Sequence, residues 1–238
     1  MACTVQSSRL HPEEYVEIGS GEPIGSENLV EFHLLYSGPL HSGGSENSRK
    51  EKHAIRKVVH SQLRQLWSIH PNLRERAVGH GGIGLTQETE KAMPSDELFQ
   101  RGVQEIAANW NRNGFNFLPL VTEKLCLRCS LEILFLRRDE RNYVLQGGDI
   151  DGRIKILFDS LRIPKDKQEL PPNTMPESEE NPFFCLLEDD SLISEVHIKT
   201  GPLLMLPGTS TIDKHEVYLE IAVRLNTTRP VAHSWVFG

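Results

Sequence analysis

The chain has 238 residues, of which 38% are hydrophobic and 25% are charged, as in a globular protein of one large domain or two small ones. No stretch approaches the roughly 18 apolar residues of a membrane-spanning helix, and the N-terminus lacks a basic segment followed by an apolar run. The formal net charge of -7 argues against a protein that coats nucleic acid non-specifically, although a local basic patch remains compatible with it. We therefore expect a soluble, cytoplasmic protein that does not bind membranes.

The N-terminal half alternates extended and helical patterns. Residues 1–28 are rich in Ser, Gly and Glu without any period, which predicts a loosely ordered arm. Residues 29–36 alternate apolar and polar side chains, as a half-buried strand does. Residues 50–69 carry apolar side chains at helical spacing, and a second helix is predicted to open at Ser95 as its N-cap. The glycine-containing stretch 70–95 between them predicts a long loop.

The C-terminal half supplies most of the predicted sheet. Strands are predicted at residues 125–136, 143–145, 193–199 and 217–225, the first two as a hairpin. A helix is predicted to start at Asp151, its N-cap, and to end at Pro164. Residues 163–183 are rich in Pro, Glu and Lys and predict an exposed, mobile insertion.

The predicted order of elements is strand, helix, helix, hairpin, helix, strand, strand. That order indicates an α+β fold with a mixed sheet of about four or five strands, three helices and long loops. Because no linker separates two independent cores, we expect a single domain over residues 29–238.

The chain contains four cysteines, Cys3, Cys126, Cys129 and Cys185. Cys126 and Cys129 form a C-x-x-C pair within a predicted strand, where residues three apart point to opposite faces and cannot share one ion. No second pair of this kind completes a zinc site. We therefore expect buried free thiols.

Basic side chains gather on the predicted helix at residues 50–69, against a single acid, Glu51. Two interpretations stay open. In the first, the helix presents an ordinary solvated face; in the second, it forms a local patch that binds DNA phosphates. In the second case the DNA-binding candidates are Lys50, Lys52, Arg56, Lys57 and Arg64.

Carboxylates occur where a metal site needs them. Asp149 and Asp151 stand two residues apart before a predicted helix, where an extended approach points both to one side. Asp190, before a later strand, can bring a third carboxylate, and Mg²⁺ is typically held by such oxygen ligands. Lys155, one helical turn beyond Asp151, can pair with an acid or steady a phosphate. From spacing alone, purely structural roles stay open: Asp151 as a helix cap, Asp159 paired with Lys155 or Arg162, and Asp189 with Asp190 in a turn.

Two segments resemble the RusA-type Holliday-junction resolvases. They are residues 149–161, DIDGRIKILFDSL, and residues 188–199, EDDSLISEVHIK. The pattern of the family runs roughly D-x-D-N-x-x-K-x-x-x-D-x-L, followed after a loop by D-D-x-x-I and a strand that ends in Lys. Gly152 stands where the family has Asn, and the loop between the two segments is longer here.

The resemblance assigns roles to individual residues. It implies that Asp149, Asp151 and Asp190 bind the metal and are catalytic, and that Lys155 matches the catalytic lysine of the family. Asp159 and Lys199 match secondary positions of the pattern. We add Lys199 to the DNA-binding candidates.

The resemblance also implies a function. The family acts as homodimers with Mg²⁺ or Mn²⁺ and cuts four-way DNA junctions. We therefore expect a RusA-like fold and a magnesium-dependent endonuclease that cleaves branched or structured DNA in recombination or repair. Two alternatives stay open: a RusA-fold module that binds nucleic acid or protein without cleavage, and a metal-dependent phosphodiesterase for a nucleotide or other small substrate.

Overall fold

The computed structural model describes residues 31–42, 46–137, 150–204 and 215–228. Within these ranges the protein contains five α-helices and two sheets, and the predicted α+β class is confirmed. None of the helices in the described ranges has both the length and the hydropathy needed to span a membrane. The arm predicted at residues 1–28 and the returning strand predicted at 143–145 lie outside the described residues.

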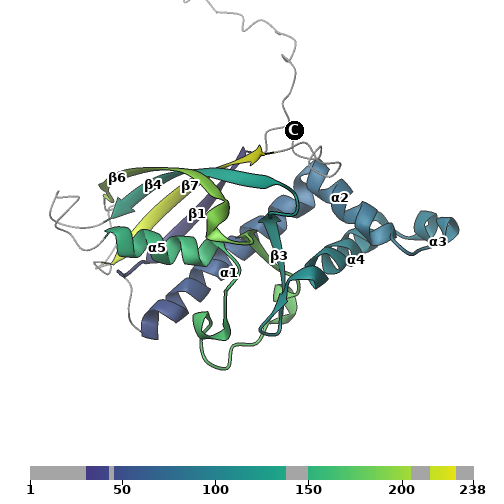
Figure 1. The fold of residues 1–238 in the computed structure, drawn as a ribbon, viewed down its shortest axis with the longest axis horizontal. Coiled ribbons are helices and arrows are strands. Elements are labelled where there is room, and N and C mark those ends of the chain that lie inside the picture. The colour runs from purple at the N-terminus through teal and green to yellow at the C-terminus, as the bar shows by residue number, and fades with distance from the viewer. Residues whose placement is uncertain (1–30, 43–45, 138–149, 205–214, 229–238) are drawn as a thin grey trace, which may run out of the picture.

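A mixed sheet of four strands forms one layer of the protein (Figure 1). Its spatial order is β1 (Glu31–Pro39), β7 (Glu216–Thr227), β4 (Leu127–Arg137) and β6 (Ile193–Pro202). β7 runs antiparallel to both of its neighbours, and β4 runs parallel to β6. In β4 and β7 every second side chain is buried, because one face of the sheet packs on the core. The strands predicted from this alternation are therefore confirmed.

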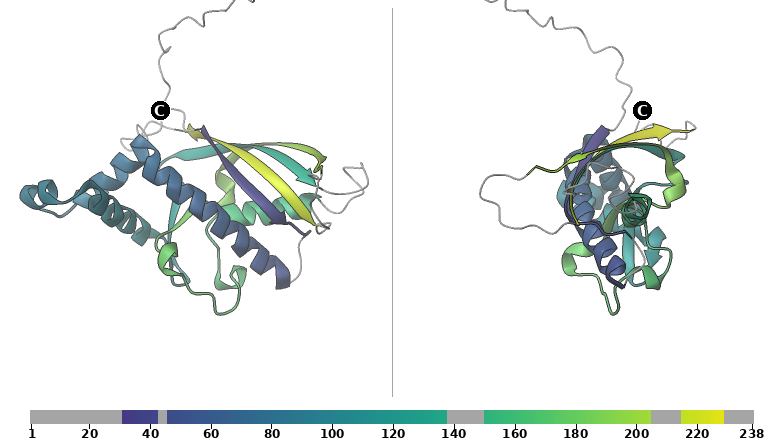
Figure 2. Two further views of the ribbon diagram at one scale, coloured as in Figure 1. Left: turned by 180° about the vertical axis from the view of Figure 1, so that it is seen from behind. Right: turned by 90° about the vertical axis from the view of Figure 1, so that its left-hand side faces the viewer.

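Two helices cover one face of this sheet, and Figure 2 shows both on the same side of it. α1 (Glu46–Ile69) buries Ile55, Val59 and Leu63, which recur every four residues. α5 (Ile150–Leu161) is shorter and packs against α1. Because α5 starts at Ile150, Asp151 lies within its first turn, and the prediction that Asp151 is the N-cap is wrong.

A second sheet contains three strands, β2 (Asn111–Arg112), β3 (Phe115–Val121) and β5 (Phe183–Leu187). β3 pairs antiparallel with β2 and parallel with β5. The prediction of one sheet with four or five strands is wrong in this respect. β5 is buried at every position and β3 at all but one, so neither shows the alternation by which a half-buried strand is recognised.

Three helices extend away from the sheets on one side of the molecule (Figure 1). They are α2 (Pro71–Gly82), α3 (Gln87–Ala92) and α4 (Ser95–Ala107), and the short 3-10 helix η1 (Ala108–Trp110) follows α4. The loop predicted at residues 70–95 and the total of three helices are therefore wrong. Ser95 is the first residue of α4 and its N-cap is Pro94, so the predicted cap is off by one residue.

Glycines explain why a helix was mistaken for a loop. In α2, Gly81 packs against α4 so closely that a Cβ there would lie 2.0 Å from the carbonyl oxygen of Leu98. In α4, a Cβ on Gly102 would lie 1.7 Å from the carbonyl oxygen of Ala77. Glycine at these positions lets the two helix backbones approach each other, and does not end a helix.

The segment 163–183, predicted to be exposed and mobile, packs against α1. It contains the 3-10 helices η2 (Lys167–Glu169) and η3 (Ser178–Glu180), and it buries Ile163, Leu170 and Glu180. More than half of its residues are nevertheless exposed, as its polar composition predicts, and its mobility stays a prediction. The polar residues of the segment make ion pairs with α1, described below.

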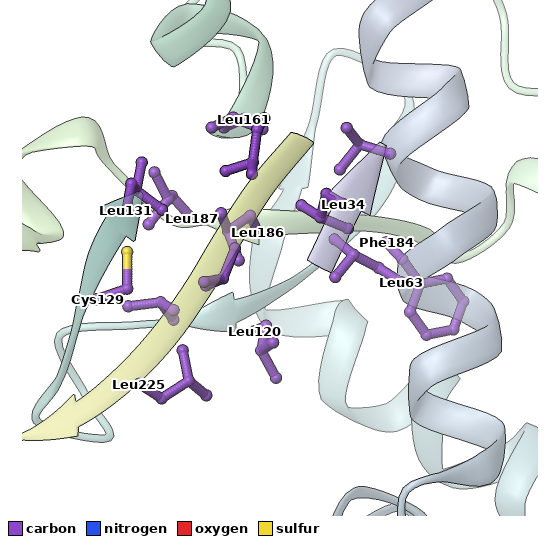
Figure 3. Close-up of a cluster of buried hydrophobic side chains, with 14 of the residues drawn as sticks. Leu34, Leu63, Leu120, Cys129, Leu131, Leu161, Phe184, Leu186, Leu187 and Leu225 are labelled. Atoms are coloured by element: carbon purple, nitrogen blue, oxygen red, sulfur yellow. The ribbon is translucent and has the colours of Figure 1, made fainter. Parts of the chain in front are cut away.

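One large buried cluster joins the two sheets and the helices. Figure 3 shows side chains from both sheets meeting there, among them Leu34 of β1, Leu225 of β7 and Leu186 of β5, together with Leu63 of α1 and Leu161 of α5. The four-stranded sheet and the three-stranded sheet thus share a core. A smaller aromatic cluster lies under α1 and the segment 163–183, formed by Phe115, Phe117, Ile163, Leu170, Phe183 and Cys185.

Candidate functional site

A groove of about 450 Å³ lies between α5 and β6. Its lining residues are Ile150, Asp151, Ile154, Lys155 and Phe158 from α5, Asp190, and Ile198 and Thr200 from β6. The three predicted site residues that the structure describes, Asp151, Lys155 and Asp190, therefore line the same groove. Asp149 lies outside the described residues.

Helix geometry places two of these side chains together. Asp151 and Lys155 are four residues apart on α5, so they lie one turn apart on the same face. Both side chains are exposed. Ile150, Ile154 and Phe158 repeat the same spacing and form an apolar stripe along the groove.

Asp190 reaches the groove from the 3-10 helix η4 (Asp190–Leu192), directly before β6. Its neighbour Asp189 caps η4, because Oδ1 of Asp189 accepts a hydrogen bond of 3.0 Å from the backbone N–H of Ser191. Hydrogen bonds from Ser191 lower the pKa of Asp189 to about 2. Both acids thus belong to a turn: Asp189 caps η4, and Asp190 is the first residue of η4 and also lines the groove.

Two cations stand beside the carboxylate of Asp190. Nζ of Lys165 lies 3.4 Å from Oδ1 of Asp190 and 3.4 Å from Oδ2 of Asp189. Nε of Arg162 lies 3.8 Å from Oδ1 of Asp190. The carboxylate of Asp190 therefore has local positive charge near it, with 37% of its side chain still exposed.

Asp159 belongs to a buried ion network and not to the groove. Its carboxylate accepts hydrogen bonds from Nζ of Lys52 at 2.7 Å and from Nη2 of Arg162 at 2.6 Å. Burial raises the pKa of Asp159, but the bonds from these cations outweigh burial and leave the pKa below its usual value. Arg162 also donates to both carboxylate oxygens of Glu169, at 2.9 and 3.0 Å. Of the alternatives left open by the sequence, the pairing of Asp159 with Arg162 is confirmed.

Three of the predicted DNA-binding residues on α1 make contacts with buried groups of the protein. Lys52 pairs with Asp159, as described above. Nη2 of Arg56 donates to the backbone oxygen of Asp159 at 2.7 Å, and its side chain is almost completely buried. Nζ of Lys57 lies 2.8 Å from Oε1 of Glu180, which is also buried. These three cations hold α1 to α5 and to the segment 163–183.

The other DNA-binding candidates lie at the surface. Arg64 pairs with Glu179, and both side chains are exposed. Nζ of Lys199 lies 2.7 Å from Oε1 of Glu132 on the neighbouring strand β4, and this pair is exposed as well. Lys50 is exposed on α1. The structure thus separates the predicted candidates into a structural group and a surface group.

The sequence reasoning missed Lys165 and Arg162 as neighbours of the site. Arg162 was considered only as a possible partner of Asp159, and Lys165 lies at the start of a segment predicted to be a mobile insertion, so neither was placed near Asp190. The only sequence signal was that three basic residues, Arg162, Lys165 and Lys167, fall within six consecutive positions. Their contacts with Asp190 span 25 residues or more and depend on tertiary structure.

The donor set of the groove fits a hard divalent ion. Asp151 and Asp190 supply carboxylate oxygens, and Mg²⁺ in proteins is often held by one or two carboxylates together with waters and substrate phosphates. Over the ranges that the structure describes, no group of three or more His, Cys, Asp or Glu side chains is arranged to hold a metal ion. A metal site in the groove would therefore depend on the two described carboxylates, those of Asp151 and Asp190.

The cysteines take no part in the groove. Cys126, Cys129 and Cys185 are free thiols; the last two are buried and Cys126 is partly exposed, which confirms the prediction for two of them. Burial raises the pKa of Cys129 to about 12, so its thiol is inert at neutral pH. Cys3 lies outside the described residues.

No family model, curated protein or solved structure matches this chain. The case for a function therefore depends on the groove and on the side chains that line it.

Proposed function

We propose that the protein is a metal-dependent endonuclease that cleaves branched or otherwise structured DNA as a homodimer, similar to the RusA-type resolvases. One observation carries the proposal: Asp151 and Lys155, from one motif segment, line the same groove as Asp190, from the other. The two segments are separate in the sequence. Four residues match the metal-binding and catalytic positions of the family pattern, and these three are the ones that the structure describes.

The groove residues suit phosphodiester hydrolysis. Asp151 and Asp190 would hold Mg²⁺ or Mn²⁺ through their carboxylates. When bound, such an ion polarises a phosphoryl oxygen and makes hydroxide available at neutral pH by lowering the pKa of a bound water. Lys155 is exposed one turn from Asp151 and would orient the scissile phosphate through its ammonium group.

Contacts with DNA outside the groove are assigned to the surface group. Exposed ion pairs typically contribute about 0 to 1 kcal/mol, so a phosphate can replace the partner of Arg64 or Lys199 at little cost. Lys52, Arg56 and Lys57 contact buried groups, and moving them would disrupt the packing of α1. We therefore retain Lys50, Arg64 and Lys199 as DNA-binding candidates.

A cleavage assay tests the proposal. The full chain is incubated with a four-way junction, a duplex and single-stranded DNA in the presence of Mg²⁺, and compared with Asp151→Asn and Asp96→Asn. Asp96 is a matched control, because it lies in the first turn of α4 as Asp151 lies in the first turn of α5. We expect Asp151→Asn to abolish junction cleavage and Asp96→Asn to leave it unchanged. Inactivity of the wild-type protein on all three substrates would refute the proposal.

A second candidate function is a binding module that has lost cleavage. It is favoured by Lys165 and Arg162, which bring positive charge to the carboxylate that a metal ion would need. This candidate predicts that the wild-type protein binds a four-way junction in an electrophoretic assay but leaves it uncut with either Mg²⁺ or Mn²⁺.

A third candidate is a metal-dependent phosphodiesterase for a small substrate. The volume of the groove lies within the roughly 300–1,000 Å³ typical of small-molecule sites, and most cations on α1 are already paired within the protein. Hydrolysis of bis(p-nitrophenyl) phosphate, without cleavage of any DNA substrate, would favour this candidate over the endonuclease.

A further inference from the structure

Lys165 lies beside Asp190, the carboxylate that a metal ion in the groove would bind. We propose that Lys165 is an internal counter-ion, which is shared by Asp189 and Asp190 in the absence of metal and withdraws from Asp190 when a divalent ion binds. The inference rests on the proposed metal site and assigns to Lys165 the role of setting its affinity.

The geometry places one ammonium group between two carboxylates. Nζ of Lys165 is equally distant, at 3.4 Å, from Oδ1 of Asp190 and from Oδ2 of Asp189. Both distances are at the long end of the range for a hydrogen bond, as expected for a cation shared by two partners. A divalent ion coordinated by Asp190 would stand next to this ammonium group and would be repelled by it.

Mobility distinguishes Lys165 from Arg162, the other cation near Asp190. The side chain of Arg162 is 3% exposed and donates hydrogen bonds to Asp159, to Glu169 and to the backbone oxygen of Ile163. It cannot turn away without breaking buried contacts. The side chain of Lys165 is 53% exposed, so it can move away from Asp190 without breaking buried contacts.

Asp189 gives Lys165 a second partner after it leaves Asp190. Oδ1 of Asp189 is engaged by the backbone N–H of Ser191, and Oδ2 faces Lys165. An ion bound to Asp190 would therefore leave the pair between Lys165 and Asp189 intact. This arrangement lets the protein exchange one cation for another at Asp190 without leaving a carboxylate unpaired.

Direct measurement of Mn²⁺ binding tests the inference without using catalytic activity. The full-length wild type, Lys165→Met and Lys167→Met are titrated with Mn²⁺ and followed by isothermal titration calorimetry. Lys167 is the matched control, because it is an exposed lysine of the same segment with no ion pair to Asp189 or Asp190 within the described residues. Both variants lower the net charge of the chain equally, so a general electrostatic effect would appear in both.

We expect Lys165→Met to bind Mn²⁺ about three- to tenfold more tightly than the wild type, the size expected when a half-exposed unit charge beside a divalent ion is removed. Lys167→Met should match the wild type. Asp190→Asn should lose binding, which locates the ion in the groove. Because Lys165 is exposed, the thermal melting temperature of Lys165→Met should stay unchanged.

The other outcomes are distinct. Equal affinity in Lys165→Met and the wild type would overturn the inference and leave the proposed metal site standing. Weaker binding in Lys165→Met would also overturn it, because Lys165 would then support the carboxylates and not compete for them. Absence of Mn²⁺ binding in all three proteins, or unchanged binding in Asp190→Asn, would overturn the proposed metal site and the inference together.

Discussion

Replacement of Asp159 by Asn should destabilise the protein strongly, because Asp159 joins α5, which carries the groove, to α1. The side chain of Asp159 is 10% exposed and pairs with Lys52 at 2.7 Å and with Arg162 at 2.6 Å. Both partners are also largely buried, with 16% of the Lys52 side chain and 3% of the Arg162 side chain exposed. Loss of one partner from a buried pair costs about 3–5 kcal/mol, since it leaves charge buried without compensation. Arg162 keeps Glu169 as a partner, so we expect about 3 kcal/mol, the lower end of that range.

Urea denaturation at neutral pH measures this loss, provided that the slope of the transition stays constant between variants. Asp96→Asn is the matched control, because the pair of Asp96 with Arg74 is exposed at the carboxylate and should contribute less than about 1 kcal/mol. A loss of less than about 1 kcal/mol in Asp159→Asn would refute the view that this network holds α5 to α1.

The loss of stability in Asp159→Asn should also depend on pH, in a direction that follows from the pKa of Asp159. The pKa of Asp159 in the folded state lies below the ordinary value of 3.8, so its stabilising contribution is present above that value and is lost as the pH falls through the folded-state pKa. The difference in stability between the wild type and Asp159→Asn should therefore shrink on acidification below about pH 4. A difference that stays constant would show that the charge of Asp159 contributes nothing to stability.

Two further substitutions test the packing of the helices. Gly102→Ala should lower stability by about 1–3 kcal/mol or more in thermal melts because its Cβ would overlap the backbone of α2, whereas Gly79→Ala, with open space around its Cβ, should be neutral or stabilising. Equal effects of the two changes would contradict the close approach of α2 and α4. His53→Leu should reduce the loss of stability of the protein between about pH 7 and pH 5, because burial lowers the pKa of His53 below 6.5 and protonation then favours the unfolded state. The matched change at exposed His197 should leave the pH profile as in the wild type.

Hydrophobic alternation predicted the half-buried strands and could not predict the fully buried ones. β4 and β7 bury one face, so their sequences alternate and were recognised. β5 is buried at all five positions, and its sequence FFCLL has no period that separates a strand from any other buried segment. The second sheet could therefore not be predicted from hydrophobic alternation, because it depends on the long-range pairing of β3 with β5.

Glycine was misread in α2 for a physical reason. A glycine is expected in loops because it tolerates many backbone conformations, and Gly84 with φ of 78° is such a case. Gly81 instead serves a helix crossing, where the absence of a side chain is the useful property. A single sequence does not distinguish these uses, because both present the same residue.

Local spacing predicted the part of the candidate site that lies on α5, and the two-segment pattern added Asp190. The four-residue interval between Asp151 and Lys155 predicts one helix face from sequence, and the structure has them on that face. That Asp159 points away from the groove, into a network with Lys52 on another helix, depends on how α5 packs on α1. The same tertiary packing turned Arg56 from a candidate phosphate ligand into a buried structural residue.

The segment 163–183 connects these observations. Its acids, with Glu169 and Glu180 buried or nearly so, neutralise the cations of α1 that sequence alone would assign to DNA. Its first basic residue, Lys165, faces the carboxylate that a metal ion would need. Under the proposed function, this one segment would both take up much of the positive charge available for a phosphate backbone and place a competing cation at the groove. Because the resemblance to the RusA pattern is interrupted by this segment, the proposed nuclease should differ in substrate and metal affinity from a compact junction resolvase.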